Sequence, residues 1–523
     1  MGEIEFLIAV LFAAAVLVRL AELVAIPYPI VLVIGGVAIG FVPGLPDIEL
    51  APEAIFLVFL PPLLHSAGFA ASPQELRAAS LQLISLTFGL VLVTMCAVAV
   101  VAHEAVGLSW PAAFILGAIL GPTDPVSAAA TFSRLGVPER VSLAVEAEAM
   151  LNDAAALVAY RVAVGAAVAG SFSLDAAAWE FVLAAAGGVA VGLAVGWAGQ
   201  RLHRRLNDAP LAIFLSVLFA YGSYVGAEEL GVSGVLATVV AGIWFGWHSH
   251  DMFDADTRLS AIAFWNVLVF GLNTTLFVLL GLQFEGILDS VRETGETGAL
   301  LVDVAIISVV VIGVRLAWIA AAPLLARVVP AVAGADPGEN WRERIVVGWS
   351  GMRGAISLAA ALALTEEIAE RELLIFITVG VIAVTLVGQG LTLAPLLRLL
   401  GIERDRHWSP DEAIARLEAA QAALDRLDEL EREQRISDER LRRMRELYRG
   451  RFRRCMAVIG GADEPRDAHA AHETIERYSE LRRELIGVER DAILGLRNEG
   501  RLRQETMRAI ERDLDLEEAR LPA

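Results

Sequence analysis

Lysine is absent from this 523-residue sequence, so all 42 strongly basic side chains are arginines. Cysteine is nearly absent too: Cys96 lies in an apolar stretch and Cys455 in a charged one, so we expect no disulfide and no thiol chemistry. The formal net charge of −20 argues against a general nucleic-acid-binding role. What the chain has in abundance is apolar sequence, with 56% hydrophobic residues and a mean hydropathy of +0.60.

Charge is scarce up to about residue 401 and dense after it. Before that point the apolar residues form blocks, most of them long enough to cross a hydrocarbon layer of ~30 Å as helices. Beyond it, Glu and Arg alternate at helical spacing, which is typical of solvated helices. We therefore predict a membrane domain over 1–401 and a cytoplasmic helical tail over 402–523. The tail is either a passive charged segment or a regulatory or dimer-supporting domain.

The apolar blocks predict an all-α polytopic membrane protein with about thirteen spans. They lie at roughly 4–24, 28–44, 52–70, 79–102, 110–132, 140–169, 178–200, 209–229, 231–247, 260–284, 299–326, 345–365 and 372–399. The third of them is interrupted by Pro61-Pro62.

Arginine distribution in the loops between these spans indicates the orientation. If the tail is cytoplasmic, the loops on its side hold Arg77, Arg134, Arg140, Arg201, Arg204, Arg205, Arg258, Arg327, Arg342 and Arg344. The opposite loops hold only Arg292 and Arg371. By the positive-inside rule, the N-terminus is then outside a plasma membrane and the tail is in the cytoplasm.

A carboxylate stands between two prolines in the fifth span, at Pro122-Thr123-Asp124-Pro125. At 1.5 Å per residue Asp124 would lie about 21 Å from the outer end of this span. Proline removes a backbone donor and frees a carbonyl of the preceding turn, so we expect the helix to be interrupted here, at mid-membrane. Asp124 then helps to bind an ion or caps the second half-helix, while Thr123 offers an oxygen to a cation.

The sixth span carries two further carboxylates, Glu148 and Asp153. An ionisable side chain at the bilayer centre costs at least ~2.5–3.5 kcal/mol, so each one requires an explanation. The two project about 140° apart around the helix and need not share a task. We expect Asp153 to face a water-filled cavity and Glu148 to neutralise a buried arginine. The alternative for Asp153 is a structural pairing with an arginine.

Two arginines fall within later spans. Arg353 stands in Gly351-Met352-Arg353-Gly354 of the twelfth span, where the flanking glycines suit a second interrupted helix. An arginine stays charged in lipid and needs a carboxylate, and we expect Glu148 to be its partner. Arg315, in the eleventh span, is expected to stabilise the core through helix packing or carbonyl contacts.

With these residues in place, the sequence resembles the monovalent cation/proton antiporters, in particular the bacterial electroneutral sodium/proton exchangers. Thr-Asp-Pro at 123–125, Glu148 with Asn152-Asp153, and Gly-x-Arg-Gly at 351–354 follow the order of that family. The resemblance covers the whole membrane domain. It implies a thirteen-helix fold with an inverted repeat, two interrupted helices that cross in a mobile core, and a homodimer.

The resemblance also implies roles for individual residues. Asp153 would carry the ion and the proton, Thr123 would lend oxygens to Na⁺, and Glu148 would pair with Arg353. Asn152 occupies the position where electrogenic relatives have a second Asp. The partners implied are the lipid bilayer and the transported Na⁺ and H⁺, with no cofactor.

One carboxylate is sufficient for exchange on this reading. Burial disfavours the charged form of Asp153, so a proton and a Na⁺ ion compete for it, and only the loaded site crosses the membrane readily. This predicts electroneutral 1:1 Na⁺/H⁺ antiport by alternating access, with a role in pH and sodium homeostasis. Relatives often have Ser where this chain has Ala149, and Glu where it has Asn266, which leaves Li⁺ or K⁺ as further substrates and K⁺/H⁺ antiport as the alternative.

Other classes of protein fit less well. Two aspartates at mid-membrane are also found in intramembrane aspartyl proteases, but the Gly-x-Gly-Asp context of those enzymes is absent and they have no need of Arg353. A cation channel would have a symmetric pore loop, which the sequence lacks. Among the histidines, His203, His248 and His250 lie at predicted cytoplasmic loops, where we expect a solvated face, with a pH sensor as the alternative.

Overall fold

The structure is a computed structural model. It describes residues 3–24, 26–42, 52–71, 80–135, 137, 139–169, 174–206, 208–294, 297–328, 340–366, 368, 370–402, 410–433, 438–460, 481–493, 496, 510, 514–515 and 517–518. All regular elements within these residues are helices. The chain forms two compact units, Met1–Arg404 and Asp405–Ala523.

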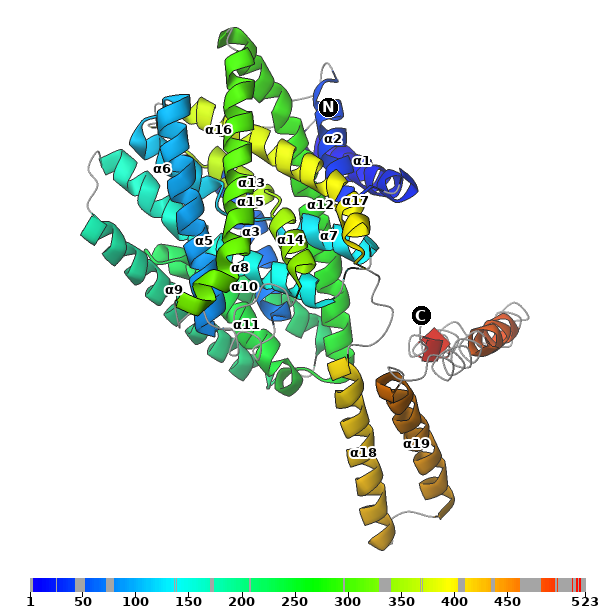
Figure 1. The fold of residues 1–523 in the computed structure, drawn as a ribbon. Helices are drawn as coiled ribbons and strands as arrows, with labels where there is room; N and C mark the ends of the chain where they lie inside the picture. The colour runs from blue at the N-terminus through cyan, green and yellow to red at the C-terminus, as the bar shows by residue number, and fades with distance from the viewer. Residues whose placement is uncertain are drawn as a thin grey trace. The chain divides into compact units, whose positions relative to one another are not determined.

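The first unit holds the apolar helices (Figure 1). They are α1 (Glu3–Val24), α2 (Tyr28–Gly40), α3 (Pro52–Ala70), α5 (Ser80–Val101), the π-helix η1 (Ala102–Val106), α6 (Trp110–Ile119), α7 (Pro125–Leu135), α8 (Glu139–Ala169), α9 (Leu174–His203), α10 (Ala209–Glu229), α11 (Gly234–Met252), α12 (Ala255–Thr294), α13 (Thr297–Val328), α14 (Trp341–Trp349), α15 (Ala355–Leu362), α16 (Arg371–Ala383), the π-helix η3 (Val384–Gln389) and α17 (Gly390–Leu400).

Length and hydropathy mark the membrane character of this unit. Within the described residues, six helical stretches are long and apolar enough to cross a bilayer. Four shorter apolar helices accompany them, at Tyr28–Gly40, Phe56–Ala70, Trp110–Ile119 and Ala155–Val168. The unit is thus all-helical and of membrane type, as the sequence predicted, while the count of thirteen spans and the inverted repeat stay predictions.

Both predicted interruptions are present. The fifth span is split into α6 and α7 by the non-helical residues 120–124, and the twelfth is split into α14 and α15 by residues 350–354. In Figure 1, α14 and α15 lie near the middle of the first unit. Proline explains the first break, since α7 begins at Pro125, and glycine the second, since Gly351 and Gly354 flank the unwound turn.

The expected interruption of the third span does not occur. α3 runs unbroken through Pro61 and Pro62. A proline cannot donate to the carbonyl four residues earlier, which for Pro62 is the carbonyl of Val58. The Tyr221 hydroxyl of α10 donates to that Val58 oxygen at 3.0 Å. A neighbouring helix therefore supplies the bond that the proline removes.

Glycines allow the closest helix contacts. A Cβ added at Gly36 of α2 would lie 2.4 Å from the Val278 carbonyl oxygen of α12, and one at Gly281 would lie 2.3 Å from the Val33 carbonyl oxygen of α2. α2 and α12 therefore pack backbone against backbone, a contact that any larger side chain would open.

The second unit contains α18 (Pro410–Arg432) and α19 (Asp438–Gly460), which lie side by side (Figure 1). A further helical stretch covers residues 481–493. Apolar side chains such as Leu427 and Leu441 are buried, whereas most charged side chains of the two helices are exposed.

Candidate functional site

The two helix breaks meet each other in the core of the membrane unit. The backbone N–H of Asp124, in the first break, donates to the carbonyl oxygen of Met352, in the second, at 2.7 Å. A Cβ added at Gly354 would lie 2.6 Å from both Cβ and Oδ2 of Asp124, so only glycine permits this approach. The unwound turns therefore pair directly and satisfy each other's backbone groups.

Asp124 caps the second half of the broken fifth span. Its Oδ1 accepts from the Val126 N–H at 3.0 Å, and its Oδ2 accepts from the Ser127 hydroxyl. Such a carboxylate satisfies free N–H groups and compensates the positive end of α7. Of the two roles that the sequence left open for Asp124, these contacts describe capping.

Arg353, in the second break, contacts the other end of the first break, where α6 stops. Its Nε donates to the carbonyl oxygen of Leu120, the C-cap of α6, at 3.0 Å, and its Nη1 donates to the Gly351 carbonyl oxygen. The side chain is 2% exposed. The negative end of the α6 dipole therefore holds this cation, just as the positive end of α7 holds Asp124.

Glu148 pairs with Arg315 rather than with Arg353, so the predicted Glu148–Arg353 ion pair is wrong. Arg315 Nη1 donates to Glu148 Oε1 at 2.5 Å and Nη2 to Oε2 at 3.1 Å. Nη2 also donates to the Val347 carbonyl oxygen at 3.1 Å. This bidentate contact matches the planar guanidinium group. Arg315 is 1% exposed.

The two arginines have exchanged their expected roles for a physical reason. Unwinding at 350–354 and at 120–124 leaves carbonyl oxygens without helical partners, and these can take up the charge of Arg353. Gly351 makes room for the other arginine, because a Cβ there would lie 2.2 Å from Cδ and Nε of Arg315. Gly351 thus accommodates the Arg315 side chain.

Asp153 differs from every one of these charged groups. It is 3% exposed, its Oδ1 has no hydrogen-bond partner, and no ion pair joins it to any basic side chain that the structure describes. The alternative of an Asp153–arginine pair therefore finds no support among the described residues. A buried carboxylate without a partner is costly, so it requires a ligand such as a proton or a cation.

Asn152 and Thr123 bring the sixth span against the first break. The Asn152 Nδ2 lies 3.5 Å from the Thr123 Oγ1, and both residues are buried. The Asn152 Oδ1 has no partner among the described residues. Oxygens of Thr123 and Asn152 therefore lie near the first break, and Asp153 follows Asn152 directly in α8. Oxygen is the ligand that hard cations prefer.

Thr385 is a site residue that the sequence reasoning missed. Its hydroxyl accepts from the backbone N–H of Arg353 at 3.1 Å and donates to the Val381 carbonyl oxygen at 2.9 Å. It is fully buried at the start of η3. A hydroxyl within the apolar run at 372–399 was the available signal.

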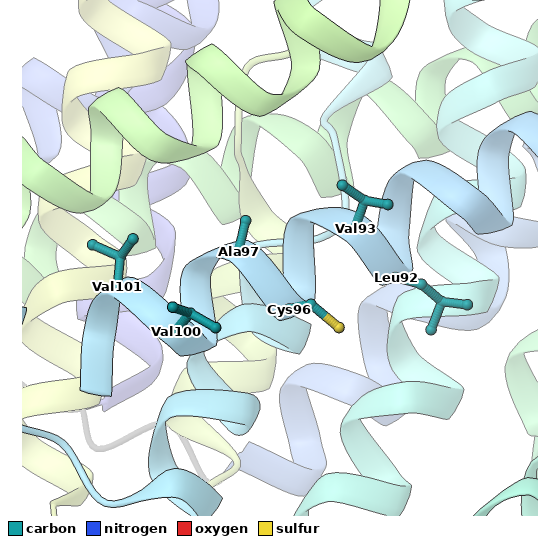
Figure 2. Close-up of a pocket in the computed structure, with 6 residues that line it drawn as sticks. All are labelled: Leu92, Val93, Cys96, Ala97, Val100 and Val101. Atoms are coloured by element: carbon teal, nitrogen blue, oxygen red, sulfur yellow. The ribbon is translucent and has the colours of Figure 1, made fainter. Parts of the chain in front are cut away.

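A hollow on the surface of α5 does not belong to this site. Figure 2 shows its lining, which comes from a single helix and consists of Leu92, Val93, Cys96, Ala97, Val100 and Val101. Leu92, Val93 and Val100 are among the exposed apolar side chains. The hollow offers no oxygen ligand from a side chain, so it is suited to lipid rather than to an ion.

Comparison with known proteins shows the family to which the chain belongs. The family described as "Sodium/hydrogen exchanger, transmembrane" matches residues 7–399. An uncharacterized Na⁺/H⁺ exchanger of Mycobacterium tuberculosis is 32% identical over 508 residues, which cover 94% of this chain and 91% of the relative. The Na⁺/H⁺ antiporter ApNhaP of Aphanothece halophytica is 32% identical over 407 residues, which cover 77% of this chain and 75% of the relative.

The fold has a solved counterpart as well. The sodium proton antiporter MjNhaP1 from Methanocaldococcus jannaschii superposes with a TM-score of 0.57 at 20% identity, covering 76% of this chain and 98% of the solved one. At that identity the likeness concerns the fold. Together with the match over residues 7–399, it agrees with the family resemblance read from the sequence motifs. The chain is an integral membrane protein that belongs to the sodium/hydrogen exchanger family.

Proposed function

We propose that this protein exchanges Na⁺ for H⁺ across the bacterial plasma membrane and that the Asp153 carboxylate carries both ions in turn. One observation carries the proposal: Asp153 is buried without an ion pair among the described residues, whereas Glu148, Arg315, Arg353 and Asp124 all have partners. Membership of a transporter family sets the intramembrane protease reading aside.

The names of the relatives support Na⁺ as the cation. ApNhaP is named a Na⁺/H⁺ antiporter, as is NhaS1 of Synechocystis, which is 32% identical over 433 residues. We propose that the oxygens of Asp153, Thr123 and Asn152 coordinate the transported Na⁺ together with water. Asp124 supports this set indirectly, because it fixes the turn that carries Thr123.

Competition for one group couples the two fluxes. A protonated Asp153 has lost the charge that attracts Na⁺, and a Na⁺ ion at the site excludes the proton. An empty, ionised carboxylate would have to cross the apolar barrier as a charge, at a cost of at least ~2.5–3.5 kcal/mol. Only the loaded site therefore alternates between the two sides, which is secondary active transport by alternating access.

Asn152 sets the stoichiometry in this proposal. Its amide carries no charge, so the site accepts one positive charge at a time, either H⁺ or Na⁺. Exchange is then 1:1 and electroneutral. The distribution of loop arginines supports a cytoplasmic tail and an N-terminus outside, and we propose that the protein works as a homodimer in the bilayer.

The test is exchange by the purified protein in liposomes, read as Na⁺-driven change of internal pH. Asp153→Asn removes the titratable group with little change in volume, so we expect folded protein whose exchange falls by at least 100-fold. Asp303→Asn, which alters a half-buried carboxylate on α13, is the matched control and should retain exchange. Exchange by Asp153→Asn at the wild-type rate refutes the proposal, and a rate that follows the membrane voltage refutes electroneutrality.

A further inference from the structure

The last membrane helix carries a polar stripe that runs alongside the broken twelfth span. Thr385, Gln389 and Thr392 follow one another at spacings of four and three residues, so they share one face of η3 and α17. Thr385 lies against the unwound turn, where it accepts from the Arg353 N–H at 3.1 Å. At the other end of the stripe, the Trp349 Nε1 of α14 donates to the Thr392 Oγ1 at 3.0 Å.

These two contacts locate Gln389 along the helix. Residue 385 contacts residue 353 and residue 392 contacts residue 349, so residue 389 lies between these two contacts in the sequence of η3 and α17. The neighbouring residue agrees, because a Cβ added at Gly390 would lie 3.5 Å from the Met352 sulfur and 2.8 Å from Ile30 Cδ1 of α2. Gln389 therefore directly precedes the residue that packs against α2 and the unwound turn.

Gln389 is the member of the stripe whose hydrogen-bonding capacity is unused. The Thr385 and Thr392 hydroxyls each accept one bond from the broken span and donate to carbonyl oxygens of their own helix. Gln389 is 2% exposed, yet neither its Oε1 nor its Nε2 has a partner among the described residues. A carboxamide offers two donors and two acceptor lone pairs, and leaving them buried and unused is costly.

The stripe also has a direction. Thr392 is exposed, Gln389 is buried, and Thr385 is buried at the crossing of the two breaks. Gln389 is the last residue of a π-helical turn, a feature that often marks functional positions because it turns a side chain away from the regular helical register. The polar groups thus lead from the side on which α17 ends towards the crossing that holds Asp153.

We propose that the Gln389 carboxamide forms a second binding station for a partly hydrated Na⁺ ion, between the crossing and the side of the membrane on which α17 ends. Its Oε1 is the ligand, and its Nε2 holds a water molecule of the ion's shell. This proposal rests on the proposed exchange function and adds to it a binding step on one side of the membrane only. The ion pauses at Gln389 before it reaches Asp153 from that side, and it bypasses Gln389 when it enters from the other.

Sided Na⁺ titrations test this station. The half-saturating Na⁺ concentration of the full-length protein is measured in everted and in right-side-out membrane vesicles. Gln389→Met keeps the length of the side chain and removes its polar atoms. We expect the half-saturating concentration to rise about tenfold on the side of the α17 end, the scale of one hydrogen bond to a charged group. On the opposite side it should change by less than twofold, and the maximal rate should stay within twofold.

A second variant and a control keep the result decisive. Gln389→Asn retains the amide on a shorter stem and should recover most of the wild-type value, even if Gln389→Met reaches the membrane poorly. Leu393→Met alters a buried neighbour in α17 and should leave both sides unchanged. Equal changes on both sides, no change on either, or a fall in maximal rate alone would overturn the station. If wild-type vesicles show no Na⁺-driven proton flux, the exchange function itself fails, which is a different outcome.

Discussion

A buried ion pair lies in the membrane unit of this protein, and solvent-exposed ion pairs lie in its tail. In the membrane unit, the Glu148–Arg315 pair is almost fully buried, with side-chain exposures of 11% and 1%. In the tail, Arg445 contacts both Asp428 and Glu431, whose side chains are 56% and 50% exposed. Water would stabilise the tail charges without any partner, whereas in the membrane core the partner or a helix end must do so.

This difference in solvation explains why each buried charge in the membrane core depends on a specific partner. Removal of a charge from water costs several kcal/mol, so a group that loses its partner there has no substitute. Exposed pairs at the tail are exchangeable, and losing one leaves the others in place. The comparison can be tested by breaking one contact of each kind.

The largest effect is expected at the buried pair. Arg315→Met leaves the Glu148 carboxylate buried without its partner, and we expect a loss of about 3–5 kcal/mol in the free energy of unfolding. Glu148→Met alone should cost a similar amount, and the double variant should recover most of the loss. Thermal unfolding in detergent, followed by tryptophan fluorescence, measures all three.

Double-mutant cycles can compare how strongly Glu148 is coupled to each of the two arginines. The coupling free energy between Glu148 and Arg315 should exceed that between Glu148 and Arg353, because only the first pair is joined by hydrogen bonds among the described residues. A larger coupling with Arg353 would restore the assignment made from the sequence and contradict the structure.

An intermediate effect is expected at the crossing of the two breaks. Gly354→Ala places a methyl group 2.6 Å from Asp124, and overpacking of this kind costs about 1–3 kcal/mol. The same unfolding measurement applies. Gly313→Ala, on α13 with open space around its Cβ position, is the matched control and should be neutral or slightly stabilising. Equal stability of the two variants would mean that the breaks do not touch.

The smallest effect is expected in the tail, and it depends on pH. The hydrogen bond from Arg445 holds the pKa of the Glu431 carboxyl below its ordinary value of 4.5. A lowered pKa in the folded state stabilises the helix pair above the ordinary value and ceases to do so as the pH falls through the folded value. Arg445→Met should therefore weaken the α18–α19 pair at pH 7 and make no difference in strong acid.

Hydrogen exchange of the full-length protein, corrected for intrinsic rates, measures this effect in α18 and α19. Arg443→Met is the control, since Arg443 pairs with Glu439 within α19 and does not join the two helices. A difference between Arg445→Met and wild type that is as large at pH 3 as at pH 7 would contradict the linkage.

Much of the fold could be predicted because the length and the interruptions of a membrane helix depend on its own local sequence. Apolar length gives a span, and proline beside Asp124 or glycine beside Arg353 gives a break. The unbroken α3 could not be predicted, because the bond that rescues it comes from Tyr221, far along the chain. Local sequence reports which backbone group is left free but not which neighbour reaches it.

For the site too, the sequence predicted single residues but not the contacts between them. The sequence proposed Asp153 and Thr123 from their positions in the spans and Asn152 from the family resemblance, and these roles stay predictions. It also predicted two buried arginines, which the structure shows, but it paired Glu148 with the wrong one. Either arginine satisfies the need for a partner, and only the three-dimensional packing decides between them.

His203 shows the same limit. The sequence predicts a solvated face, yet the side chain is buried between helices and both ring nitrogens lie 2.9–3.0 Å from carbonyl oxygens. Its position at the end of α9 was visible in the sequence, but the rings that cover it come from other helices, for example Phe245 of α11.

The bond between Tyr221 and Val58 has a mechanical consequence. A helix that slides past its neighbour by one turn moves about 5.4 Å along the axis, which is enough to part a hydroxyl from a carbonyl 3.0 Å away. The proline leaves that carbonyl no alternative donor in its own helix. The bond therefore favours movement of α3 and α10 as one body.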